Sequence, residues 1–394
     1  MDLLTKMEKR LEEMYPELVR IRRDLHMYPE LSFKEVETPR KIAEFLQGLG
    51  IEVRTGVGGR GVVGTLKGTK PGKRIALRAD FDALPIQDEK EVEYKSRVPG
   101  VMHACGHDLH TAGLLGTAAA LSAFRDELKG EVAFIFQFAE EEVPGGAVSM
   151  IGDGCLDGVD VIYGAHVWSS LPFGTVGIIP GRAMAAGDRF EIEIIGKGGH
   201  GAKPHITVDA LFVGTRLVDS LHSIVSRQVD PLQPAVVTVG TFHAGQAYNV
   251  IAERAVITGT VRTFDEDVRN AVEASIRRMT EAVCQSYGAR AEVKYERGYP
   301  VLVNHPEAIR KVEASALRTV GEDRVRRPAP SMGMEDFAYY LQKVPGAFFY
   351  VGGGNEEIGA SYPHHHPKFD ADERAMLVAG RMFLSLVADE LADE

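Results

Sequence analysis

Residues 102–113, MHACGHDLHTAG, concentrate side chains that bind metal ions. Cys105 and His107 lie two residues apart, on what the pattern predicts is a loop entering a helix. Thiolate and imidazole are strong ligands for zinc and similar divalent ions, and a loop allows both side chains to face one centre. On their own the two residues are equally compatible with a buried cysteine and a histidine that makes a hydrogen bond at a helix end.

Further metal-binding side chains follow predicted strands, where open α/β sheets build their sites. Glu140 and Glu141 end the apolar run FIFQFAEEE, His166 ends VIYGAHVW, and histidines 364–366 lie in the loop YPHHHPKFD. A carboxylate at the end of a buried strand is costly unless a cation pairs with it. Taken singly, the carboxylates could be a solvated edge, His166 a hydrogen-bonded core histidine, and the C-terminal histidines surface residues.

As a set, these segments supply a thiolate, carboxylates and imidazoles, enough for a two-metal centre with a bridging ligand. Two adjacent glutamates can have different roles, since one can bind metal while the other acts as the general base toward water. The combination suits hydrolysis of an amide or an ester.

Three polar residues in the middle of the chain are candidates for substrate contacts. His200 lies in GKGGHGAKPH, where the glycines allow a close approach to a ligand and the imidazole could donate to a developing oxyanion. Asn249 in YNVIA and Arg262 in GTVRTF are candidate contacts to a carbonyl and a carboxylate. Each of the three could equally be a surface residue on a hairpin or strand.

The element pattern predicts two domains. Helices at the N-terminus, short β-rich runs, a helix from about Asp108 and the strands EVAFIFQF and VDVIYGAHVW indicate a three-layer α/β domain. From about Asp188 the order becomes β-α-β-β-α-β, the ferredoxin-like plan, and the α/β texture returns from Val301. We therefore predict a catalytic domain formed by residues 1–185 and 299–394, with an inserted lid or dimerisation domain at 186–298.

Composition excludes several classes of protein. The 394 residues carry a formal net charge of −11, so nucleic acid is a poor partner, and no apolar tract is long enough to cross a membrane. Three widely separated cysteines do not form a disulfide framework, and the N-terminus has no apolar region of a signal peptide. We expect a cytoplasmic protein.

Ordered motifs along nearly the whole chain resemble one family. The chain resembles the aminoacylase and hippurate hydrolase subfamily of the two-metal amidohydrolase and glutamate carboxypeptidase superfamily, which also contains auxin-amino-acid conjugate hydrolases. The motifs are RRDLHMYPELSFKEVET (22–38), LRADFDALPI (77–86), MHACGHDLHTA (102–112), AEEEVPGGA (139–147), GAHVW (164–168), GKGGHGAKPH (196–205), NVIAERA (249–255), GTVRTF (259–264), MEDFAYY (334–340) and HHHPKFDADE (364–373).

The resemblance implies a role for each matching residue. It implies a metallo-exopeptidase-like catalytic domain in which Glu140 is the general base. His200 would steady the oxyanion, in many relatives within the site of a partner subunit, and Asn249 and Arg262 would contact the substrate. Asp80 would orient a ligand histidine from the second coordination sphere. The implied metal ligands are Cys105, His107, Glu141, His166 and His365, with Cys105 as the bridge.

Two departures from the family pattern affect these assignments. The wider superfamily has His-x-Asp where this chain has Arg78-Ala79-Asp80, so one ligand is absent there. A third acid, Glu142, extends the family's AEE, and we assign base and ligand from the start of that motif. Among the three C-terminal histidines, His365 fits the pattern His-x-Pro-x-Phe.

We therefore predict metal-dependent hydrolysis of the amide bond of N-acyl amino acids, with N-acetyl, N-benzoyl or similar acyl groups. The expected cofactors are two divalent ions per subunit, drawn from zinc, manganese, cobalt and nickel. The expected assembly is a homodimer or homotetramer formed through the lid domain. The alternatives are a dipeptidase or carboxypeptidase with the same centre, a non-catalytic metal-binding scaffold, and a redox sensor that uses Cys105.

Overall fold

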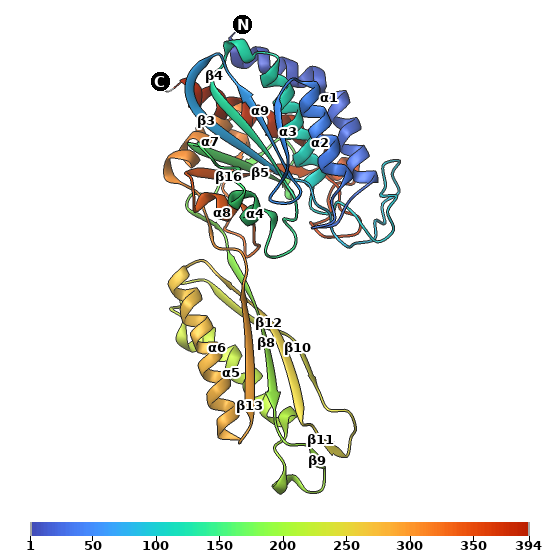
Figure 1. The fold of residues 1–394 in the computed structure, drawn as a ribbon, viewed down its shortest axis with the longest axis vertical. Coiled ribbons are helices and arrows are strands. Elements are labelled where there is room, and N and C mark those ends of the chain that lie inside the picture. Colours follow the sequence, from blue (N-terminus) through green and yellow to red (C-terminus); the bar gives the residue numbers. More distant parts are fainter. Residues whose placement is uncertain (1, 393–394) are drawn as a thin grey trace. The chain divides into compact units, whose positions relative to one another are not determined.

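The computed structural model describes residues 2–392, which form two compact units (Figure 1). The first unit contains the chain up to Gly181, Val303–Ala329 and the chain from Asp336; the second contains Arg182–Leu302 and Pro330–Glu335. The segment Pro330–Glu335, which the sequence pattern assigns to the catalytic domain, groups with the second unit. Residue 1 and residues 393–394, at the outer ends of the predicted catalytic domain, lie outside the described residues.

The first unit is built around one mixed sheet. Its strands are β1 (Glu52–Val57), β2 (Gly61–Lys67), β3 (Lys70–Asp80), β4 (Lys129–Gln137), β5 (Val161–Pro172), β6 (Val176–Gly177), β15 (Val325–Arg326) and β16 (Gly346–Gly354). They lie in the order β1-β2-β4-β3-β5-β16-β6-β15, and the four central strands β4, β3, β5 and β16 are parallel. The carboxyl ends of these strands therefore meet at one edge of the sheet, which is where parallel α/β sheets bind ligands.

Helices cover both faces of this sheet, which confirms the predicted three-layer α/β fold. The helices are α1 (Leu3–Met27), α2 (Glu37–Gly48), α3 (His107–Ser122), α4 (Gly146–Gly152), α7 (Pro306–Val320), α8 (Phe337–Leu341) and α9 (Ala375–Ala392), with single-turn 3₁₀ helices η1 (Arg125–Glu127), η3 (Glu322–Arg324) and η4 (Glu356–Ile358). Helices α3 and α9 pack on one face with α1 against both of them, whereas α8 lies on the other face.

Helix α3 carries the second half of the MHACGHDLHTAG motif into the core. Each residue from His107 to Leu121 is buried, because the helix lies between the sheet and the layer formed by α1 and α9. A helix that is apolar on all sides needs such an environment. The loop that precedes α3, which contains Cys105, is therefore anchored at its C-terminal end by a buried helix.

The second unit has the predicted β-α-β-β-α-β order. Its elements are β7 (Arg182–Met184), β8 (Ala186–Ile195), β9 (Gly199–His200), η2 (Pro204–Ile206), α5 (Ala210–Gln228), β10 (Ala235–Ala244), β11 (Val250–Ile251), β12 (Arg254–Thr263), α6 (Glu266–Ser286) and β13 (Arg290–Arg297), and β14 (Leu302–Val303) crosses its boundary. The antiparallel sheet has the order β10-β12-β8-β13, and β9 pairs with β11 in a separate ribbon. This is the ferredoxin-like arrangement.

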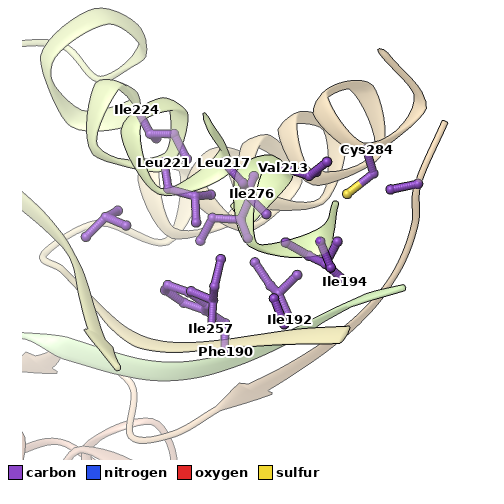
Figure 2. Close-up of a cluster of buried hydrophobic side chains, with 14 of the residues drawn as sticks. Phe190, Ile192, Ile194, Val213, Leu217, Leu221, Ile224, Ile257, Ile276 and Cys284 are labelled. Carbon is purple, nitrogen blue, oxygen red and sulfur yellow. The ribbon is translucent and has the colours of Figure 1, made fainter. Parts of the chain in front are cut away.

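Alternating residues of β8 build the core of this unit (Figure 2). Phe190, Ile192 and Ile194 point toward the two helices, where Leu217 and Leu221 lie one turn apart on α5. Period two on the strand and period four on the helix bring these side chains together, and each fully buried aliphatic side chain contributes about 1.5–3 kcal/mol to folding. Within the described residues, no helix has both the length and the apolar character needed to cross a bilayer.

Candidate metal centre

The carboxyl edge of the central strands brings the predicted ligands of the first unit together. Asp80 is the last residue of β3, His166 lies in β5, and the segment with Glu140 and Glu141 follows β4. Cys105 and His107 are separated by Gly106, whose φ of 94° is a left-handed conformation that glycine adopts without strain. This turn sends the chain into α3 while both flanking side chains reach the same centre.

Two groups of potential ligands overlap at one sulfur atom. Cys105, His107 and His166 form one group, and Cys105, Glu141 and His365 form the other; within each group the ligand atoms lie within 4.8 Å of one another. The Sγ of Cys105 is 3.4 Å from Nε2 of His166, and Nε2 of His365 is 3.4 Å from Oε1 of Glu141. A shared Cys105 is the arrangement that a bridging thiolate requires.

Two buried atoms in these groups make no hydrogen bond. They are Nε2 of His107 and Oε1 of Glu141, which lie 3.9 Å apart. Buried polar atoms nearly always make hydrogen bonds. The absence of one at both the imidazole nitrogen of His107 and the carboxylate oxygen of Glu141, which also lies 3.4 Å from Nε2 of His365, therefore fits a cation among these ligands. The donor set of thiol, imidazole and carboxylate suits zinc and other first-row divalent ions.

Asp82 fixes the orientation of His107. Its Oδ1 and its backbone oxygen lie 3.1 and 3.0 Å from Nδ1 of His107, so Nε2 of the ring is turned toward Glu141. The Oδ2 of Asp82 also accepts from the backbone N–H of Glu141 at 3.0 Å. One carboxylate thus connects two of the segments that carry ligands, in the way that outer carboxylates orient metal-binding histidines.

Burial and neighbouring charges shift the pKa values of two predicted ligands, His107 and Cys105. Burial disfavours a charged His107, but the carboxylates of Asp80 and Asp82 outweigh it and raise the pKa of His107 to about 10. Burial and the neighbouring Glu141 and Glu140 raise the pKa of Cys105 well above its ordinary value. The negative charge collected here is therefore balanced by protons, which a bound cation would displace.

Glu140 lies at the same edge and is buried, only 6% exposed. It shares a candidate group with His107 and Glu141, whereas Glu142 is exposed and belongs to none of the candidate groups among the described residues. Two adjacent acids therefore face the centre.

The last ligand-bearing segment contains the three C-terminal histidines. His365 adopts a left-handed φ of 64° and its backbone N–H donates to the oxygen of Ala104, which ties this segment to the Cys105 loop. His364 instead accepts at Nε2 from the backbone of Ser169, and its ring lies 4.8 Å from that of Trp168. His366 stacks on Tyr362. Of the three, only His365 belongs to a candidate ligand group of the described residues.

Arg78 takes the position where the wider superfamily has a histidine. Its guanidinium is buried and donates to Oδ2 of Asp80 at 2.6 Å, to Gln137 at 3.0 Å and to Oδ1 of Asp336 at 2.9 Å. Arginine stays charged and has no lone pair to offer a metal, so Arg78 acts here as a fixed cation that neutralises two buried carboxylates.

The second unit contains the remaining predicted residues. His200 and Asn249 are both exposed and lie together, because Gly201 N–H donates to the Asn249 oxygen and His200 pairs with Val250. Arg262 lies elsewhere in the unit, paired with Gly187 near the C-terminal end of β12. Arg262 is eight positions after Arg254, which faces Ile195 at the end nearest His200, and eight positions span about 26 Å along a strand.

Comparison with known proteins identifies a family that matches most of the chain. The model of Peptidase family M20/M25/M40 matches residues 76–389. The chain belongs to this family. The resemblance seen in the sequence motifs is thereby confirmed.

Relatives of this M20 chain include hydrolases of more than one kind. YhaA of Bacillus subtilis (strain 168), which is named as an amidohydrolase, is 52% identical over 96% of both chains. N-acetyl-L-cysteine deacetylase of the same strain is 43% identical over 100% of this chain and 93% of its own. Thermostable carboxypeptidase 1 of Saccharolobus solfataricus is 43% identical over 100% of both chains.

A solved structure extends the comparison to the metal centre. The Bacillus subtilis YXEP protein, described as a dinuclear metal binding peptidase of the M20 family, superposes with a TM-score of 0.84. It is 39% identical, and the match covers 97% of this chain and 100% of that one.

Sequence reasoning on this M20 chain missed two residues of the centre. Asp82 orients His107, as described above, whereas Asp80 accepts from Nδ1 of His110 at 2.6 Å. His110 in turn accepts at Nε2 from the backbone N–H of Val167, the residue after His166. Asp80 therefore fixes the orientation of His110, and His110 in turn binds the backbone of β5, the strand that contains His166. The signals were present as a second aspartate two residues after Asp80 and a histidine three residues after His107.

Proposed function

We propose that this M20 protein hydrolyses the amide bond of N-acyl amino acids, such as N-acetyl or N-benzoyl derivatives, with two divalent ions per subunit. The observation that carries the proposal is the pair of ligand groups that share Cys105, with Glu140 beside them. Its relatives include a deacetylase that acts on an N-acetyl amino acid and a dinuclear metal binding protein. Zinc, manganese, cobalt and nickel all suit the donor set.

Bound at Cys105, His107, Glu141, His166 and His365, the two ions would polarise the scissile carbonyl and acidify the attacking water. Glu140 takes the proton from that water and delivers it to the leaving amine, so a single carboxylate serves as base and then as acid. Asp82 and Arg78 keep the surrounding side chains in place while charge moves. The products are a carboxylate and a free amino acid.

The inserted unit acts as a lid in this proposal and brings the substrate-binding residues. His200 steadies the oxyanion, Asn249 contacts the carbonyl and Arg262 the carboxylate. Because Arg262 lies about 26 Å along the sheet from the His200 end, one copy of the unit does not deliver all three residues to one small substrate. We therefore infer a homodimer, or a homotetramer built from it, in which His200 and Asn249 serve the partner's site.

A mixing experiment tests this shared site. His200→Asn and Glu140→Gln should each be inactive, but after dissociation and reassociation the mixed dimers contain one complete site. About a quarter of the wild-type activity should return if the subunits exchange at random. No recovery from properly mixed dimers would show that His200 does not act across the subunits.

A second candidate function is cleavage of peptide bonds by the same centre. Its support is the 43% identity with a protein named thermostable carboxypeptidase. A non-catalytic metal-binding scaffold would not need the buried carboxylate of Glu140 beside the ligands. A redox sensor needs a thiol of low pKa, whereas the pKa of Cys105 is raised.

A panel of substrates separates the two hydrolytic functions. Free-amine release is measured from N-acetyl, N-benzoyl and longer N-acyl amino acids and from dipeptides, using protein stripped by chelator and reloaded with a single metal. Release from acyl amino acids supports the proposal; release from dipeptides alone moves the function to a peptidase. No release with any metal would refute both.

We also propose a cytoplasmic location, supported by the three cysteines, all of which are free thiols.

A further inference from the structure

A cluster of buried and partly buried charged residues lies next to the two ligand-bearing loops of the first unit. We call it the Arg22 cluster; its members are Arg22, His26, Lys90, Asp108 and Asp370. Two of these residues adjoin the loops directly. Asp108 directly follows His107, and Asp370 lies five residues after His365. None of the five belongs to a candidate ligand group of the described residues.

One guanidinium connects both loops. Arg22, on α1, is fully buried, and its Nε lies 2.8 Å from Oδ2 of Asp108 while its Nη2 lies 2.7 Å from Oδ1 of Asp370. The rigid, planar fork of arginine can hold two carboxylates at a fixed separation, which a lysine ammonium does not do. The positions of Asp108 and Asp370 relative to each other are therefore set by Arg22.

Lys90 provides a second connection between the same segments. Its Nζ donates to the backbone oxygen of Phe369 at 2.8 Å and to Nε2 of His26 at 2.7 Å. His26 in turn donates from Nδ1 to Oδ2 of Asp108 at 2.7 Å. Two routes, which both begin at Oδ2 of Asp108, thus connect the start of α3 to the residues just after the C-terminal histidines.

The two loops differ in how much they depend on this cluster. His107 is the first residue of α3, which is buried along its length and holds that loop in any case. Residues 361–372, by contrast, contain no helix or strand, and the side chain of His365 is 53% exposed. The position of His365 therefore depends on the contacts that anchor its segment.

We propose that Arg22 and Lys90 are positioning residues of the metal centre, which hold His365 in place and so set the affinity for the ion bound by Cys105, Glu141 and His365. The other ion, at Cys105, His107 and His166, depends on α3 and β5 and is little affected. The inference rests on the two-ion centre of the proposed function. It assigns a role to the RRDLH segment of the sequence, far along the chain from any ligand.

The test measures the affinity of each ion separately. Zinc binding to metal-free protein is followed by calorimetry in competition with a chelator, for wild type, Arg22→Lys and Lys90→Met. Arg20→Met is the matched control, because Arg20 lies on the same helix two residues before Arg22 and is exposed. Circular dichroism and the Tm of each metal-free protein establish that it is folded.

We expect both cluster variants to bind one ion with wild-type affinity and the other about 10- to 100-fold more weakly, the loss typical of residues that orient metal ligands. Arg20→Met should bind both ions like wild type. If Arg22→Lys does not fold, Lys90→Met, which leaves the Arg22 ion pairs intact, decides the question.

Folded variants that keep both affinities, or that lose both equally, would overturn the positioning role. A wild-type protein that binds fewer than two ions would instead refute the two-ion centre of the proposed function, so the two failures are distinguishable.

Discussion

Glu35 should make the first unit less stable at alkaline pH. Its side chain is only 1% exposed, and Oε1 accepts from the backbone N–H of Ala139, next to Glu140, while Oε2 is buried without a hydrogen bond. Burial, together with the nearby Asp82, raises the pKa of Glu35 from 4.5 to about 7. The distant guanidinium of Arg60, 3.9 Å from Oε2, compensates only in part.

The size of the effect follows from linkage. Because the folded pKa lies above the unfolded one, the stability associated with a protonated Glu35 is fully present below pH 4.5 and is lost as the pH rises through 7. At about 1.4 kcal/mol per pKa unit, the contribution of Glu35 should fall by about 2.5 kcal/mol between pH 5 and pH 8. Glu35→Gln keeps an acceptor for Ala139 and removes the titration.

Urea unfolding of metal-free wild type and Glu35→Gln at pH 5 and pH 8 measures this difference. Trp168, the only tryptophan of the chain, reports on the first unit alone. Other titrating groups are common to both proteins and cancel in the comparison. Glu37→Gln, which alters an exposed acid of the same segment, should retain the pH dependence of wild type. An identical pH dependence in Glu35→Gln and wild type would refute the reasoning.

Three further predictions address the centre itself. Glu140→Gln should bind metal normally but lose about 10²- to 10⁴-fold in kcat. Its control, Glu142→Gln, changes an exposed residue and should stay active. A fully active Glu140→Gln would exclude Glu140 as the general base. Cys105→Ala should weaken both ions, because both groups share its sulfur, while Cys155→Ala should bind two ions in a direct zinc titration. Binding of cobalt should quench the fluorescence of Trp168, because the ring of Trp168 lies 5.5 Å from that of the predicted ligand His166. Zinc has a filled d shell and should not quench it. Cobalt binding without quenching would place the ions elsewhere.

Much of the fold could be predicted because local patterns determine it. Period-two runs, amphipathic helices and the β-α-β-β-α-β order depend on residues close in sequence. The candidate ligands could be found for a related reason, since each follows a buried strand or precedes a buried helix, and parallel strands bring such ends together. That Pro330–Glu335 groups with the second unit could not be predicted, because no pattern of nearby residues indicates it.

The partners of buried polar residues could not be predicted. Arg22 and Asp370 are 348 positions apart, and Arg78 meets Asp336 across 258, so their pairing depends on the complete tertiary packing. For the same reason, the sequence did not reveal that Asp80 binds His110 while Asp82 binds His107. Residue type and spacing indicate which side chains can do chemistry; the packed structure decides which of them support it.

The most direct test of a two-ion amide hydrolase is the rate of amine release from an N-acyl amino acid as zinc is added to metal-free protein. The structure predicts no turnover before metal is added, full activity at two zinc ions per chain, and little or none for Cys105→Ala at the same two zinc ions per chain. Turnover by the stripped protein, or by Cys105→Ala at the wild-type rate, would contradict a metal centre at Cys105 as the site of catalysis.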